Sequence, residues 1–263
     1  MSSDRPGASA ESGLAIECIG LTKSYRIGQE LSLQRSMSRL LRPWRSQPLE
    51  RFGALDDLSF TVPRGAFFGI VGPNGSGKST LTQVLSGITV PSGGEARVWG
   101  QILPLLEVGA GFHDELTGRE NIYLLGAILG LPIGMINASV ARIVEFAGVH
   151  RHLDTAMKRY SSGMKARLSF STAICFPADI YVFDEVLAVV DDDFRGQCHQ
   201  ALDELNAQGR TILFMSHDLD LVVEMCSTGM WIEHGHQRHV GPIQEVAAAY
   251  RGNSDHVLEG VAS

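Results

Sequence analysis

The sequence predicts an α/β fold built on a mostly parallel sheet. Two short apolar segments, residues 180–183 and 211–215, flank a stretch of helical character at 194–207. Such alternation is typical of parallel strands buried on both faces. A glycine-rich loop at 72–77 separates a third apolar segment from a helix predicted at 80–86. With 263 residues, the chain is long enough for one large α/β domain, alone or with an inserted subdomain.

The other elements are predicted from apolar runs and turn residues. Residues 1–13 are rich in Ser, Gly and Ala, and we expect a disordered tail there. The predicted strands are 15–20, 58–62 (after a turn at 55–57), 66–71 and 96–99 (after a turn at 91–94). Residues 101–165 are expected to be mainly helical, 230–235 to form a terminal hairpin, 243–250 a closing helix and 251–263 a short tail.

Composition narrows the class of function. The net charge of −7 argues against a general nucleic-acid binder, which would usually be basic. The four cysteines show no metal-ligand spacing, so reduced thiols in a cytosolic protein are the simplest interpretation. No charged residue lies between Glu120 and Arg142, but Pro132, Asn137 and several glycines interrupt this stretch. We therefore expect a helix at 121–129 and no membrane span.

A phosphate-binding loop follows the apolar segment at 66–71. Glycines let backbone N–H groups approach phosphates, because a Cβ would block that approach. Lys78 can reach the β- and γ-phosphates, the Ser79 hydroxyl can ligate Mg²⁺, and the N-terminus of the next helix favours an anion. The sequence thus predicts a site for a nucleoside triphosphate with Mg²⁺, formed by Gly72, Pro73, Asn74, Gly75, Ser76, Gly77, Lys78, Ser79 and Thr80.

Polar residues follow two of the predicted core strands. Asp184 and Glu185 close the strand at 180–183, and a carboxylate at that end, beside a phosphate loop, can hold Mg²⁺ through water. Glu185 is then placed to polarise the water that attacks the γ-phosphate. His217 follows the strand at 211–215 and is a candidate γ-phosphate sensor.

The segment Tyr160-Ser161-Ser162-Gly163-Met164-Lys165 completes a set of motifs that resembles the ATP-binding-cassette (ABC) ATPases over about residues 15–250. In that family a Ser-Gly-Gly-Gln signature opens a helix and contacts the ATP held by a second copy of the domain. Ser161 and Gly163 match the signature, whereas Ser162 and Met164 depart from it. A helix N-terminus with a hydroxyl and a small residue still suits an anion.

The resemblance implies a P-loop NTPase core with a mostly parallel sheet, an antiparallel β subdomain and an inserted helical subdomain at 101–165. It implies ATP and Mg²⁺ as cofactors, a second copy of the chain as partner, and an integral membrane permease. Further site residues follow from it: Asp191 as the D-loop aspartate at the dimer seam, Tyr25 as an aromatic that stacks on adenine, and Glu107 in the metal set, where the family usually carries Gln.

In two departures from the usual family motifs, the chain resembles one branch of the family. Glu107 in place of Gln, and Ser-Ser-Gly-Met at 161–164, look like the ATPase subunits that export lipid-linked polysaccharides of the O-antigen, capsule and teichoic acid types. An insert at 26–52 carries six arginines and an apolar face at helical spacing. A basic amphipathic helix over 31–42 would suit an anionic lipid headgroup; a surface helix packed on its own domain is the alternative.

The sequence thus predicts the ATP-hydrolysing subunit of a polysaccharide exporter, bound at the cytoplasmic face of the cell membrane. Two alternatives stay open: an ABC ATPase that energises export of another lipid or drug cargo, and a cytosolic ABC protein without a transport role. Gene neighbourhood would distinguish the first, and co-purification with a membrane protein the second.

Overall fold

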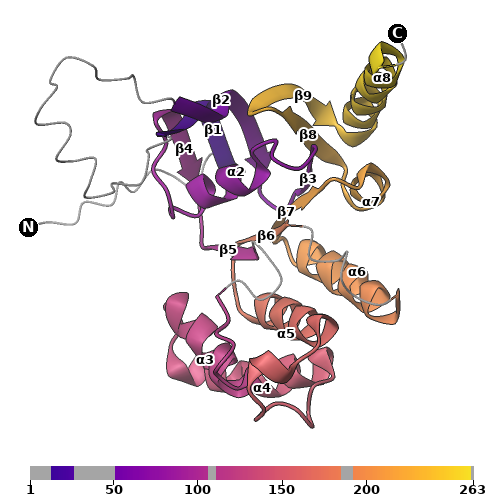
Figure 1. Ribbon diagram of the computed structural model, residues 1–263. Helices are drawn as coiled ribbons and strands as arrows, with labels where there is room; N and C mark the ends of the chain where they lie inside the picture. Colours follow the sequence, from indigo (N-terminus) through magenta and orange to yellow (C-terminus); the bar gives the residue numbers. More distant parts are fainter. Residues whose placement is uncertain (1–12, 27–50, 106–110, 185–191, 262–263) are drawn as a thin grey trace, which may run out of the picture.

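The computed structural model describes residues 13–26, 51–105, 111–184 and 192–261. Nine strands of these residues form a single sheet in the order β4-β1-β2-β9-β8-β3-β7-β6-β5. Helices α3, α4 and α5 lie together at one end of the molecule, below the sheet in Figure 1. The predicted α/β class is confirmed, with the antiparallel strands at one end of the sheet and the parallel strands at the other.

The parallel part of the sheet is buried on both faces. Its strands are β3 (Phe67–Val71), β5 (Ile102–Leu105), β6 (Ile180–Asp184), β7 (Thr211–Ser216) and β8 (Thr228–Glu233). In β6, Ile180 and Val182 pack into one core while Tyr181 and Phe183 pack into another. Because successive side chains of a strand point to opposite faces, a run of apolar residues is what this position requires.

The antiparallel part differs from the prediction at one turn. It contains β1 (Leu14–Arg26), β2 (Arg51–Pro63) and β4 (Gly93–Val98), with the hairpin strand β9 (His236–Pro242) beside β2. The expected turn at 55–57 lies inside β2, where Asp57 has a left-handed φ of 53°. The pairing of β1 with β2 shifts register at this point, so the turn residues bend a continuous strand.

The insert predicted at 26–52 begins and ends in paired backbone. Arg26 pairs with Arg51 and Tyr25 with Phe52 across β1 and β2. The two ends of the insert are therefore strand and not helix. The basic helix expected at 31–42 lies outside the described residues, as does most of the tail expected at 1–13.

Within the described residues, four helices accompany the sheet: α2 (Lys78–Leu85), α6 (Asp192–Ala207), α7 (Leu219–Met225) and α8 (Ile243–Val261). The predictions for α2 and α6 are correct within two residues. The closing helix is longer than expected, because α8 runs to Val261 and takes up residues assigned to a tail. The hairpin prediction is also correct, since β8 and β9 pair antiparallel.

The helical part contains α3 (Gly118–Ile128), α4 (Ile133–Ala147), the 3₁₀ turn η1 (Met157–Arg159) and α5 (Ser162–Cys175). The stretch 101–165 is therefore not helical from its start, because β5 belongs to the main sheet. No helix among the described residues combines the length and the apolar character that crossing a membrane would need.

A cluster of phenylalanines joins the helical part to the sheet. Phe170 of α5 lies 5.4 Å from Phe183 of β6 and 6.1 Å from Phe194 of α6, measured between ring centroids. Phe146 of α4 lies 5.5 Å from Phe194 in an edge-to-face arrangement. Aromatic pairs at these distances each contribute about 1 kcal/mol beyond burial of their area. Helix α5 is thereby packed directly against the strand that ends in Asp184.

Candidate nucleotide-binding site

The phosphate loop at 72–77 connects buried strand β3 to helix α2. Val71 pairs with Ser216 of β7, and Asp184 at the end of β6 pairs with Met215. The carboxyl ends of three adjacent parallel strands thus meet at one edge of the sheet, where ligands of open α/β sheets bind. The loop, Asp184 and the segment after β7 lie together for this reason.

Two glycines of the loop are required by its surroundings. A Cβ on Gly72 would lie 2.1 Å from the carbonyl oxygen of Ile232, and one on Gly77 would lie 2.6 Å from that of Ala54. Gly77 also has a φ of 112° as it caps α2, a value that L side chains rarely adopt. Gly75 has a φ of 77° with open space around it, so there the backbone conformation alone favours glycine.

The residues after the loop present the groups that a magnesium nucleotide needs. Lys78 is buried, and its ammonium donates to the carbonyl oxygens of Gly72 and Pro73 at 2.7 and 3.2 Å, which places it within the curve of the loop. The Ser79 hydroxyl lies 3.1 Å from a carboxylate oxygen of Asp184, 105 residues away in the chain. Oxygen atoms of a hydroxyl and a carboxylate are hard ligands of the kind that Mg²⁺ prefers.

The rest of the loop fits a phosphate group. Ser76 is 2% exposed, and its hydroxyl has no hydrogen-bond partner among the described residues. Asn74 and Gly75 are exposed at the crest of the loop, while Pro73 and Thr80 are half-buried. A glycine-lined loop at a helix N-terminus, with one lysine and one hydroxyl–carboxylate pair, fits a triphosphate with Mg²⁺.

Two further predicted residues lie near this half-site. His217 is exposed directly after β7, and the next residue, Asp218, caps α7 by accepting from the backbone N–H of Asp220 and Leu221. Tyr25 lies at the end of β1, and its hydroxyl donates to Gln83 of α2 at 3.4 Å. The ammonium of Lys23 lies 5.0 Å from the centroid of the Tyr25 ring. Tyr25 is therefore held beside the phosphate-loop helix.

The signature segment is at the surface of the helical part. Ser161 is the N-cap of α5 and accepts a hydrogen bond from the backbone N–H of Met164 at 3.2 Å. Ser161 and Ser162 are exposed and Gly163 is half-buried. Figure 1 shows α5 in the lower, helical part and α2 in the upper part of the molecule. A single chain therefore presents its phosphate loop and its signature segment as separate sites.

Comparison with known proteins identifies the family. Residues 55–188 match the family model described as ABC transporter. The chain belongs to the ABC transporter family of ATP-binding proteins. It is 37% identical to RfbB, the O-antigen export system ATP-binding protein of Myxococcus xanthus, over 92% of this chain and 56% of RfbB. It is 39% identical to TagH, the teichoic acids export ATP-binding protein of Listeria monocytogenes, over 88% of this chain and 68% of TagH.

The chain thus spans little more than half the length of RfbB from Myxococcus xanthus. Among solved structures, a dimeric ATP-binding cassette in a post-hydrolysis state, bound to ADP and phosphate, superposes with a TM-score of 0.71. The match covers 87% of this chain and 98% of that cassette at 18% identity. This similarity shows that the ABC cassette fold extends across both the sheet and the helical part.

Three residues expected in this ABC ATPase site fall outside the described residues: Glu107, Glu185 and Asp191. Their assignments stay sequence-based predictions. The structure brings together the loop, Ser79 and Asp184, with His217 at the same edge of the sheet. The signature residues lie on another element, α5.

Helix α3 begins earlier in the chain than predicted. The sequence predicts the helix at 121–129, but α3 starts at Gly118, because Thr117 and Glu120 form a capping box. The Glu120 carboxylate accepts from the backbone N–H and the hydroxyl of Thr117, and these hydrogen bonds lower its pKa. A threonine followed three residues later by glutamate is the pattern that would have predicted this start.

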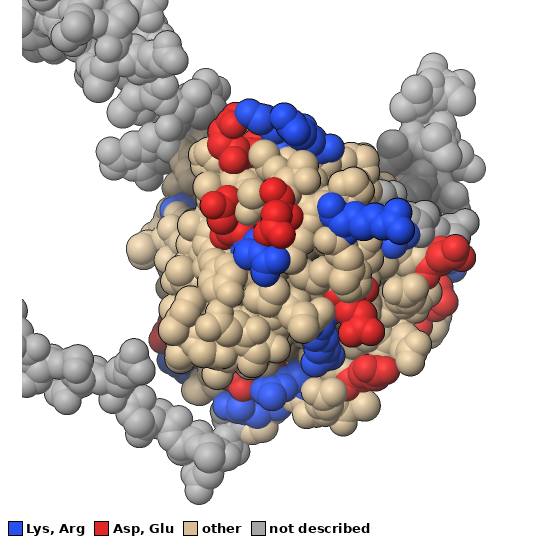
Figure 2. All heavy atoms as spheres, turned by 90° about the horizontal axis from the view of Figure 1, so that it is seen from below, with Lys and Arg blue, Asp and Glu red and all other residues tan. Residues whose placement is uncertain are grey.

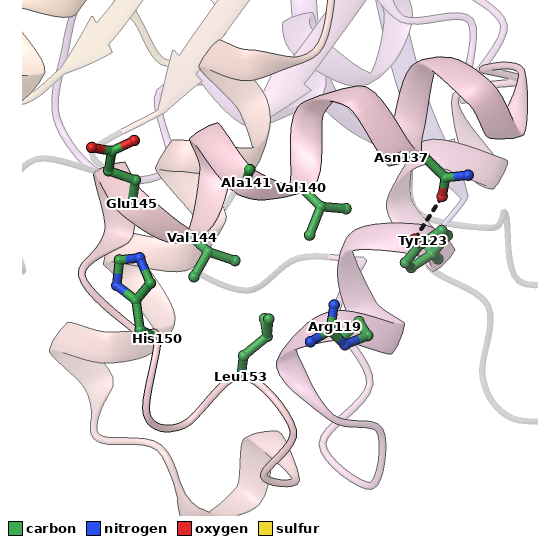
Figure 3. Close-up of a pocket in the computed structure, with 9 residues that line it drawn as sticks. All are labelled: Arg119, Tyr123, Asn137, Val140, Ala141, Val144, Glu145, His150 and Leu153. Atoms are coloured by element: carbon green, nitrogen blue, oxygen red, sulfur yellow. Dashed lines mark hydrogen bonds between the residues drawn. The ribbon is translucent and has the colours of Figure 1, made fainter.

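A surface pocket also lies in the helical part, with a volume of about 710 Å³ (Figure 3). At one end of the pocket the Tyr123 hydroxyl donates to Asn137 at 2.6 Å, which ties α3 to α4 (Figure 3). The pocket is lined by Arg119, Tyr123, Asn137, Val140, Ala141, Val144, Glu145, His150 and Leu153. None of these residues belongs to the phosphate loop or the signature segment, so the pocket is separate from both halves of the nucleotide site.

Proposed function

We propose that this protein binds and hydrolyses ATP as the ATPase subunit of an exporter of lipid-linked polysaccharide. The ATPase part of the proposal rests on the contact between Ser79 and Asp184 at the end of the glycine loop. In that loop, neighbouring backbone leaves no room for a side chain at Gly72 or Gly77. The loop N–H groups and Lys78 bind the phosphates, and Ser79 and Asp184 hold Mg²⁺. Mg²⁺ held by these two residues would neutralise charge on the phosphate oxygens.

The protein's own residues then orient the attack on the γ-phosphate. We assign Glu185, which follows Asp184, to polarise the attacking water, and His217 to sense the γ-phosphate from the neighbouring strand. Tyr25 would stack on adenine, and Glu107 would join the metal set at the entrance to the helical part. The exposure of the first turn of α5 favours a composite site. In this site Ser161, Ser162 and Gly163 contact ATP held by a second copy of the chain, and Asp191 lies at the seam between the two copies.

The cargo and the membrane partner are inferred from the relatives. RfbB and TagH are named for export of O-antigen and of teichoic acids. We therefore propose an integral membrane permease as partner and a peripheral position at the cytoplasmic face of the membrane. We expect no nucleic-acid partner, because the chain is acidic overall and acidic and basic side chains are interspersed on the face shown in Figure 2.

Glu185→Gln tests the ATPase assignment. The change removes the carboxylate that orients water but keeps Asp184 and the phosphate loop, so steady-state hydrolysis should fall by about a thousandfold while ATP still binds. An ATP-dependent dimer should accumulate in sedimentation experiments. Hydrolysis within threefold of the parent would contradict the role of Glu185.

A charge change in the insert tests the cargo assignment. Replacing Arg35, Arg39 and Arg42 together with Gln should leave ATP hydrolysis intact and abolish polymer at the cell surface, because arginine can pair bidentately with the phosphates of a lipid carrier. The matched control replaces three arginines that are exposed in other elements, Arg64, Arg238 and Arg251. Normal export by the first variant would show that the insert serves only packing.

A further inference from the structure

Asn121 is a fully buried polar residue in the first turn of α3, outside every motif assigned above. Its side-chain oxygen accepts from the backbone N–H of His113 at 2.6 Å. Its amide group donates to the carbonyl oxygens of His113, Leu116 and Thr117 at 3.0, 3.2 and 2.9 Å. This set needs one oxygen that accepts and a group that donates more than one hydrogen bond, and a side-chain amide offers that combination. Asn121 thus holds the turn at 113–117 in one conformation.

That turn is paired with the segment that leads into the signature. The backbone N–H of Met157 donates to Leu116 at 2.8 Å and that of Lys158 donates to Asp114 at 2.9 Å, while Thr117 forms a β-bridge with Ala156. Ion pairs strengthen the pairing at the surface: Lys158 with Glu115 at 2.6 Å, and Lys165 of α5 with Asp114 at 2.5 Å.

Tyr160, the residue before Ser161, is held by the same region. Its ring is buried, and its hydroxyl donates to the carbonyl oxygen of His152 at 2.7 Å. Burial raises the pKa of that hydroxyl, so it stays a donor at neutral pH. A Cβ on Gly118 would lie 2.5 Å from the Tyr160 hydroxyl oxygen, which shows how closely α3 packs on this side chain. The backbone that enters α5 is thus fixed by contacts to the turn and to the start of α3.

We propose that Asn121 is a positioning residue for the signature segment: through the turn at 113–117 it sets the place and direction of the first turn of α5. The inference rests on the proposed composite site, in which Ser161 and Gly163 contact ATP held by the other copy. Because Asn121 touches neither nucleotide nor phosphate loop, its loss weakens closure of the dimer and leaves binding of nucleotide to the single chain unchanged.

The test replaces Asn121 with Asp in the Glu185→Gln background. Aspartate keeps the shape of the side chain but has no N–H to donate to the carbonyl oxygens of His113, Leu116 and Thr117. Two quantities are measured: the affinity of the monomer for a fluorescent ADP analogue, and the dimer dissociation constant with ATP and Mg²⁺ by sedimentation velocity. We expect unchanged ADP affinity and a dimer about tenfold weaker, the effect of losing one or two buried hydrogen bonds.

Asn206→Asp is the matched control. The Asn206 amide donates to the carbonyl oxygens of Gly65 and Arg210 at 2.8 and 3.2 Å, so the change also removes backbone contacts. These contacts lie at the amino ends of β3 and β7, whereas the phosphate loop lies at the carboxyl end of β3. This control should dimerise like the parent. Tyr160→Phe provides a second variant should Asn121→Asp not fold; it removes only the hydroxyl contact and should weaken the dimer about threefold.

The possible outcomes separate the two proposals. Dimerisation of Asn121→Asp, or of Tyr160→Phe in its place, at the parental affinity would overturn the positioning role, and so would an equal loss in Asn206→Asp. Ser161→Arg is measured in parallel. If it also dimerises like the parent, or if the parent itself stays monomeric with ATP, the composite site is wrong, whatever the asparagine variants show.

Discussion

The phosphate loop and the signature segment both lie at helix N-termini, yet the chain constrains them differently. In the loop, Gly72 and Gly77 are enforced by the chain itself, because the carbonyl groups of Ile232 and Ala54 occupy the space of a side chain. At the start of α5, a Cβ on Gly163 would meet only the Ser161 hydroxyl, at 3.9 Å. The signature segment itself has open space around it, and its N-terminal serines are exposed.

The difference shows which part of the site a single chain completes. A glycine that its neighbours or its own φ enforce is explained by folding, whereas Gly163 has neither constraint within the chain. The composite-site proposal explains Gly163 by ATP bound by a second copy. Four experiments test this contrast between the two regions, in order of decreasing effect.

Gly72→Ala should give the largest loss. The new methyl group would lie 2.1 Å from a backbone oxygen of β8, which cannot yield as a flexible side chain would. We expect nucleotide affinity to fall by more than about a hundredfold and stability by about 1–3 kcal/mol. Calorimetric titration with ADP and urea unfolding measure both. Gly75→Ala, in open space, should cost less, and binding by Gly72→Ala within threefold of the parent would contradict the enforced loop.

Mixing two inactive chains should restore part of the hydrolysis. Lys78→Ala removes the phosphate ligand and Ser161→Arg blocks the signature, so a mixed dimer keeps one complete site and loses the other. With random pairing, about half of the dimers are mixed and each has one of two sites, so about a quarter of the parental activity should return. The assay is steady-state phosphate release against mixing ratio. A mixture as inactive as its components would argue against a shared site.

Gly163→Ala should separate folding from assembly. Within the single chain the methyl group fits, so the monomer should be as stable as the parent or more so by about 0.5–1 kcal/mol. ATP-dependent dimerisation should weaken by about tenfold if the signature approaches phosphate closely. Gly134→Ala is the matched control, because Gly134 is also the second residue of its helix and has nothing within 4 Å. Equal dimerisation by both variants would refute close contact at Gly163.

Thr117→Ala should give the smallest effect. It measures how much the N-cap of α3, in the helical part that carries the signature segment, contributes to the free energy of unfolding. Loss of this capping side chain should cost about 1 kcal/mol in urea unfolding.

The pKa of Glu120 is lowered in the folded state by its hydrogen bonds to Thr117. The stability that Glu120 supplies is therefore present above its unfolded-state pKa and is lost as pH falls through the folded value. The stability difference between the parent and Glu120→Gln should accordingly disappear in acid.

Much of this fold could be predicted because its signals are local. Apolar runs predicted strands β3, β6 and β7, the glycine loop predicted the start of α2, and Ser161 marked the start of α5. One error came where a local signal was weaker than a distant contact. Residues 55–57 have the composition of a turn, but pairing with β1 on one side and β9 on the other keeps them within a strand.

The sequence by itself determined the family, the chemistry of the phosphate loop and the boundaries of α2 and α6, because these depend on residues a few positions apart. Only the tertiary structure decided that Ile232 and Ala54 close the space beside Gly72 and Gly77. It also decided that Asn121 organises the turn against which the signature segment rests. Some of these contacts join segments that are distant in sequence, and others depend on the path of a turn. The order of the strands and the packing of the helices determine both kinds.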